Sequence, residues 1–118
     1  MIKAYRIYTG EDGHSHIQEG CIKQHVSVKV KHTHFEETYA ADTLDWHTAP
    51  IAQYVITVGG VLKFTTRTNE TCIINPGDIL LAEDCTGTGH VWELLTDEPW
   101  KRMYVVYEEG QDDLFEMV

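Results

Sequence analysis

Residues 53–66 read QYVITVGGVLKFTT, and they set the expected fold class. The first part, Gln53 to Val58, is rich in β-branched and aromatic side chains, which suit the pleated surface of a strand. Val61 to Thr66 has the same character, and the pair Gly59-Gly60 lies between the two runs. Two such runs joined by two glycines predict a tight β-hairpin.

Further short strands are expected on both sides of this pair. From His25 to His34, Val26, Val28 and Val30 alternate with polar residues, which predicts a half-buried strand. Four later runs also have strand character: 71–75, 79–82, 90–95 and 101–107, separated by turn residues such as Asn75-Pro-Gly-Asp78. No apolar stripe with the helical period of about 3.6 residues persists for three turns. We therefore expect an all-β protein, an antiparallel sandwich or barrel.

The length of 118 residues predicts a single domain, and no repeat or second domain is visible. The tail carries four apolar residues, Leu114, Phe115, Met117 and Val118, which we expect to dock on the barrel or on a second subunit. A chain of this size buries only about two-thirds of its unfolded surface. A homodimer that shares sheet area is therefore expected.

The charge balance excludes some classes of partner. Lys plus Arg is 9 and Asp plus Glu is 19, so the formal net charge is 9 − 19 = −10. Such a surface repels phosphate, which argues against binding to nucleic acid or to anionic membranes. The start, MIKAYR, is too polar for a signal peptide, so a cytoplasmic location is expected. The three cysteines lack paired spacing, which argues against a disulfide framework or a zinc ribbon.

Two histidines and a glutamine near the starts of expected strands are candidates for a functional site. His47 precedes the QYVITVGG run, Gln53 opens that run, and His90 begins a later strand after Gly87-Thr-Gly89. If these strands surround one interior, the two imidazoles and the amide converge there. Convergent imidazoles suit metal binding or proton transfer.

The stretches WHTAPIAQYVITVGG and INPGDILLAEDCTGTGH resemble the two motifs of the cupin superfamily, G-x5-H-x-H-x3-4-E-x6-G and G-x5-P-x-G-x2-H-x3-N. The resemblance covers residues 45–107. It is nearest to a subgroup of small bacterial cupins that has no assigned reaction. It implies that residues 1–118 form one cupin-type antiparallel β-sandwich, a jelly-roll barrel, with its ligand inside.

The departures from the motifs bear on metal binding. His47 fits the first histidine and Gln53 stands in place of the glutamate, but Ala49 occupies the second histidine position. In the second motif Glu83 replaces the proline, His90 arrives two residues late, and Leu94 holds the place of the asparagine. An uncharged amide is a weak ligand for a transition metal. We therefore expect a divalent transition metal to be weakly bound or absent; if one binds, its ligands are His47, Gln53 and His90.

The expected function is binding of a polar small molecule inside the barrel, with metal-independent acid–base chemistry of the isomerase, epimerase or lyase type. His47 and His90 are the candidate catalytic residues, because an imidazole pKa near 6.5 suits proton transfer near neutral pH. Candidate substrate-binding residues are Trp46, Gln53, Trp92 and Glu83. Two alternatives stay open: a ligand-binding or sensor module without turnover, and a metal-dependent cupin enzyme with an atypical ligand set. Each histidine can also be a structural core residue, and Glu83 a solvated loop residue.

The remaining histidines are expected outside the site. His32-Thr33-His34 repeats the H-x-H pattern, and both imidazoles share one strand face where they could chelate an ion. Lys29 and Lys31 disfavour a cation there, so we expect a strand end near the barrel mouth. His14 and His16 follow the turn Glu11-Asp12-Gly13 and are expected to be solvated, although a strand crossing the barrel opening would bring them closer.

Overall fold

The computed structural model describes residues 1–40 and 45–118, in which two β-sheets pack against each other. The larger sheet has the strand order β10-β2-β1-β7-β4-β9-β3, and its strands in chain order are β1 (Ile2–Thr9), β2 (Ser15–Ile22), β3 (Val30–Thr38), β4 (Gln53–Gly59), β7 (Ile79–Glu83), β9 (Trp100–Tyr107) and β10 (Phe115–Met117). The smaller sheet has the order β6-β5-β8 and consists of β5 (Leu62–Thr66), β6 (Thr71–Ile74) and β8 (His90–Leu94). The predicted all-β sandwich is confirmed.

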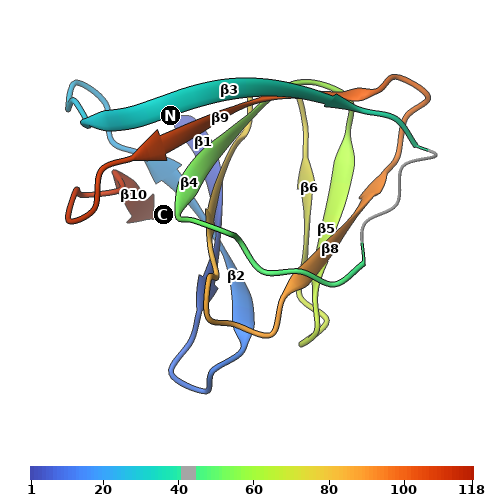
Figure 1. The fold of residues 1–118 in the computed structure, drawn as a ribbon, viewed down its shortest axis with the longest axis horizontal. Helices are drawn as coiled ribbons and strands as arrows, with labels where there is room; N and C mark the ends of the chain where they lie inside the picture. The colour runs from blue at the N-terminus through green and yellow to red at the C-terminus, as the bar shows by residue number, and fades with distance from the viewer. Residues whose placement is uncertain (41–44) are drawn as a thin grey trace.

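Figure 1 shows β5, β6 and β8 together on one side of the molecule and β1, β2 and β10 on the other, with β3 along an edge. No helix in the described part of the chain is long and apolar enough to cross a membrane.

Alternation along the strands of the larger sheet creates two apolar layers. Val55 and Leu80 point toward the smaller sheet, where they join Leu62, Phe64 and Ile74 in the main core. Their neighbours Tyr54 and Leu81 point the other way and pack with Tyr107 in a second cluster. Partly buried Val28 and Phe115 pack against that second cluster on the outer face of the sheet.

The predicted hairpin at Gly59-Gly60 is wrong. β4 pairs with β7 and β9, whereas β5 pairs with β6 and β8, so the glycine pair turns the chain from one sheet into the other. Both edges of β4 are occupied, which leaves no edge for β5. Gly60 has φ +85°, and a Cβ there would lie 2.9 Å from the carbonyl oxygen of Pro99. The corner therefore requires glycine.

The half-buried strand predicted over His25 to His34 is also displaced. β3 begins only at Val30, pairs with β9 alone and is exposed along nearly its whole length. Val26 and Val30 are exposed and only Val28 is partly buried. The alternating valines therefore do not form a buried strand face. Val26 and Val28 precede β3, and β3 itself is an edge strand with only one neighbouring strand.

Two further features concern the larger sheet. β1 runs parallel to β7, which departs from the uniformly antiparallel arrangement expected from the sequence. The tail docks on its own chain: Leu114 is buried and β10 pairs with β2. Met117 and Val118 stay exposed.

Candidate functional site

A cavity of about 500 Å³ lies between the two sheets. Alternate residues of β4, β7 and β9 face it from the larger sheet, because successive side chains of a strand point to opposite faces. Phe64 of β5 and two residues of β8, His90 and Trp92, face it from the smaller sheet. Side chains of β3 line it as well. The cavity therefore has mainly apolar walls with a limited set of polar groups, as in many small-molecule sites.

A buried polar pair, Asp84 and His90, lies beside this cavity. Asp84 is fully buried and His90 is 4% exposed. Nδ1 of His90 lies 2.9 Å from Oδ2 of Asp84 and donates to it. The same oxygen accepts from the hydroxyl of Ser15 at 2.6 Å, and Oδ1 accepts from the backbone N–H of Ala49 at 3.2 Å. Three hydrogen bonds thus compensate the burial of the carboxylate and fix its orientation.

This arrangement defines the proton state of His90. When Nδ1 carries the proton that bonds Asp84, Nε2 of the neutral ring keeps its lone pair. The carboxylate behind Nδ1 also fixes the orientation of the ring. Asp84 therefore prepares His90 to accept a proton at Nε2.

His47 is held beside His90 by backbone pairing. The two residues form an isolated antiparallel bridge, with His90 N donating to His47 O at 2.9 Å and His47 N donating to His90 O at 3.2 Å. Gly89 permits this approach, since its φ is +96° and a Cβ there would lie 3.0 Å from the carbonyl oxygen of His47. The ring centroids are 4.5 Å apart.

The electrostatics of His47 favour its neutral form. Burial lowers the pKa of its imidazole, and the nearby His90 lowers it further, against the opposing hydrogen bond with the carbonyl oxygen of Asp45. That bond, 3.0 Å long, uses Nδ1 as the donor. His47 therefore offers a neutral imidazole next to His90 on the cavity wall.

Gln53 also faces the cavity and is 6% exposed. Among the described residues, none forms a hydrogen bond with its side-chain amide. The amide therefore retains both donor and acceptor capacity for a bound molecule.

The two tryptophan candidates lie in different places. Trp92 lines the cavity and packs edge-on against Trp100, with ring centroids 5.1 Å apart. Trp46 is not among the lining residues; its ring packs under the guanidinium of Arg67 at 4.5 Å. Trp46 is half-buried and does not line the cavity, although it is the neighbour of His47 in sequence.

Glu83, a candidate for substrate binding, lies away from the cavity. It follows Ala82, which faces the cavity, so alternation turns Glu83 to the other face of the larger sheet. There its carboxyl group accepts a short hydrogen bond from the hydroxyl of Tyr107. Burial raises the pKa of Glu83 to about 7, with a further contribution from Asp113 and an opposing one from the Tyr107 hydrogen bond. The acid that contacts His90 is its neighbour Asp84.

The expectation that His32 and His34 lie outside the site is wrong. Both line the cavity, together with Glu36 and Thr38 on the same face of β3. Opposite them on β9, Arg102 and Tyr104 line it too. Sequence reasoning missed this group, although the alternation His32-x-His34-x-Glu36-x-Thr38 is a period-two signal for one polar strand face.

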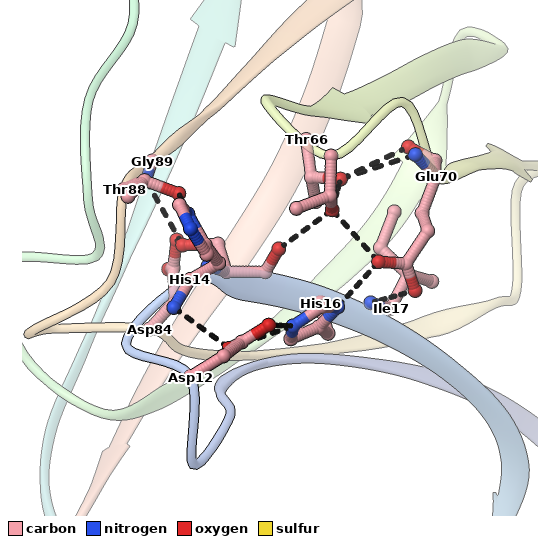
Figure 2. A network of polar contacts seen from close by, with 11 residues as sticks. Asp12, His14, His16, Ile17, Thr66, Glu70, Asp84, Thr88 and Gly89 are labelled. Carbon is pink, nitrogen blue, oxygen red and sulfur yellow. Dashed lines mark hydrogen bonds and ion pairs between the residues drawn. The ribbon is translucent and has the colours of Figure 1, made fainter.

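His14 and His16 belong to a polar network around the β1–β2 turn, shown in Figure 2. His16 bridges Glu70, at 2.5 Å from Nδ1, and Asp12, at 2.8 Å from Nε2. His14 contacts the hydroxyl of Thr88 at 3.2 Å. Neither imidazole lines the cavity.

The donor set at the cavity does not fit a cupin-type metal centre. Ala49 supplies no ligand atom where the motif has its second histidine, and Gln53 is uncharged. The carboxylate beside His90, that of Asp84, is already hydrogen-bonded to Ser15, Ala49 and His90. Across residues 1–40 and 45–118, no group of three or more His, Cys, Asp or Glu side chains is arranged to hold a metal ion.

No protein-family model matches the chain, and no curated protein matches it either.

Proposed function

We propose that this protein binds a polar small molecule between its two sheets and transfers a proton to or from it through His90. The observation that carries the proposal is the buried Asp84–His90 pair on the wall of a 500 Å³ cavity. A buried carboxylate behind an imidazole is the arrangement that positions a general base. The resemblance to the small cupins is part of the same proposal, and the two-sheet architecture with His47, Gln53 and His90 at one cavity supports it.

Each polar group has a role in this reaction. Nε2 of His90 takes a proton from the ligand, and the resulting imidazolium is stabilised by Asp84. The neutral imidazole of His47 is a hydrogen-bonding partner for the developing charge, and the amide of Gln53 fixes a carbonyl or hydroxyl group. The reaction class is isomerisation, epimerisation or elimination by proton transfer.

Deuterium exchange tests this proposal without knowledge of the full reaction. Small 2-oxo acids and hydroxy ketones are incubated with the protein in D₂O, and loss of the proton next to the carbonyl is followed by ¹H NMR. We expect accelerated exchange for at least one compound, and a loss of about 10²-fold or more in the His90→Gln variant, the usual effect of removing a general base. His25→Asn is the matched control, because His25 is exposed at φ +66°, a conformation that asparagine tolerates.

Other results favour the alternatives. Ligand binding without exchange favours a ligand-binding or sensor module. One equivalent of iron, nickel or zinc per chain, measured by elemental analysis, favours a metal-dependent enzyme with an atypical ligand set.

A further inference from the structure

A second polar cluster lines the cavity on β3 and β9. The aromatic rings of Trp100 and Phe64 lie between this cluster and His90. Its centre is Arg102, whose guanidinium stacks on Trp100 at 3.9 Å from the ring centroid. Trp100 in turn contacts Phe64, and Phe64 contacts His90, with ring centroids 5.8 and 6.0 Å apart. Arg102 and His90 thus stand on one cavity with aromatic rings between them.

The charge of Arg102 is poorly compensated for a residue that is only 6% exposed. Arg102 forms four hydrogen bonds with residues that the structure describes, and three of them go to neutral acceptors: Nε to the hydroxyl of Tyr104, and Nη1 to the hydroxyl of Thr38 and the carbonyl oxygen of Trp100. Within the described ranges, its one carboxylate partner is Glu36. A buried cation without a strong counter-ion is costly, so this site favours an added negative charge.

Glu36 is a weak partner for Arg102. Its Oε1 lies 3.4 Å from Nη2, longer than the 2.7–2.9 Å usual for a charge-assisted bond. Its side chain is 47% exposed, and its other oxygen lies 2.8 Å from Nε2 of His34, which holds it on the β3 side. A ligand carboxylate therefore competes with Glu36 for Nη2 without leaving Glu36 unpaired.

We propose that Nη2 of Arg102 binds a carboxylate of the ligand. The ligand then belongs to the monocarboxylates with a planar, unsaturated body, which the rings of Phe64, Trp92 and Trp100 surround. This assignment rests on the proposed function in one respect: the reacting carbon of the same molecule faces His90. A phosphate dianion fits less well, because Glu36 repels a second negative charge more strongly than a first.

Benzoate and its neutral counterpart benzamide are the probes, with binding measured by calorimetry at pH 7 on the full chain. We expect benzoate to bind at least about tenfold more tightly than benzamide. Arg102→Met removes this preference. Because that variant can lose stability, Glu36→Gln gives an independent test: it tightens benzoate binding several-fold and leaves benzamide binding unchanged.

Glu37→Gln is the matched control for Glu36→Gln. It removes the same charge from the next residue of β3, which points away from the cavity, and it leaves the benzoate preference unchanged. Equal binding of benzoate and benzamide to the wild type overturns the proposal. Absence of benzoate binding, tighter binding of phenyl phosphate, or equal effects of the two glutamate variants also overturn it.

The experiments distinguish failure of proton transfer by His90 from failure of carboxylate binding by Arg102. A preference for benzoate that persists in His90→Gln, with no deuterium exchange in any compound, supports the carboxylate site and contradicts the proton transfer. Exchange that depends on His90, with equal benzoate and benzamide binding, contradicts the carboxylate site alone.

Discussion

Ser15 links three parts of the molecule through one hydroxyl. It is fully buried at the start of β2, donates to Asp84 and accepts from the backbone N–H of Gly89 at 2.9 Å. The hydroxyl thereby positions both the acid behind His90 and the turn in front of it. This makes Ser15 a positioning residue for the candidate site.

Ser15→Ala removes this hydroxyl and leaves a buried N–H without its partner. We expect the free energy of unfolding, measured by chemical denaturation, to fall by about 1–3 kcal/mol. Ser27→Ala is the control, because Ser27 is exposed and its change should stay within about 0.5 kcal/mol. Equal effects of the two substitutions would refute the linking role of Ser15.

Glu83 gives the protein a predicted dependence of stability on pH. Its raised pKa, about 7 because of burial, means that the folded state keeps a proton which the unfolded state releases near the ordinary value of 4.5. Its contribution to stability is therefore complete below that ordinary value and is lost as the pH rises through about 7.

Glu83→Gln removes this dependence, because glutamine does not titrate. We expect the unfolding free energy of the wild type to fall relative to that of the variant between roughly pH 5 and pH 8, in denaturation series at several pH values. Glu93→Gln, on an exposed position of β8, should follow the wild type. A constant difference between wild type and Glu83→Gln across this range would contradict the assignment.

At the scale of elements, the corner between β4 and β5 connects the two sheets that form the cavity. Gly60→Ala forces a side chain into the left-handed region and toward the carbonyl oxygen of Pro99. We expect a loss of about 1–2 kcal/mol or more in unfolding free energy.

Gly59→Ala is the comparison for Gly60→Ala. Gly59 has no positive φ, and its added Cβ would meet the side chain of Glu98, which is free to move. The loss at this position should be clearly smaller. A ranking in the opposite order would show that the corner does not depend on the conformation of Gly60.

Most strands from β4 onward follow from the sequence, whereas their pairing does not. β5 to β9 appear within a residue or two of the β-branched runs, because glycine, proline and polar turns bound those runs. Gly59-Gly60 has the local chemistry of a hairpin turn, but the partners of β4 come from distant β7 and β9. The strand predicted over His25 to His34 is shifted relative to β3, Val30–Thr38. The valine pattern predicts a buried face, but β3 is an exposed edge strand, and its position at the edge depends on the pairing of distant strands.

At the scale of the whole molecule, the homodimer expected from the chain length stays a prediction. Sedimentation equilibrium should give twice the mass of 13.5 kDa. A single species at the monomer mass over a wide concentration range would contradict it.

The sequence predicted some of the residues that line the cavity and missed others. The structure brings His47, Gln53, His90 and Trp92 to one cavity. The sequence suggested His47, Gln53 and His90 because they stand before or at the start of expected strands and match motif positions, and it suggested Trp92 because it lies two residues beyond His90. Arg102 and Glu36 were missed because 66 positions separate them, and only the register of β3 with β9 brings them together. Glu83 and Asp84 differ by one position, yet only the chain reversal after β7 decides which of them meets His90.

The proposed proton transfer requires that Asp84 holds the proton of His90 on Nδ1 and leaves Nε2 free to accept one. A long-range ¹H–¹⁵N NMR spectrum of the ¹⁵N-labelled protein near neutral pH reports the protonation of each ring nitrogen directly. We expect a protonated Nδ1 and an unprotonated Nε2 for neutral His90. A neutral His90 with its proton on Nε2 would contradict it.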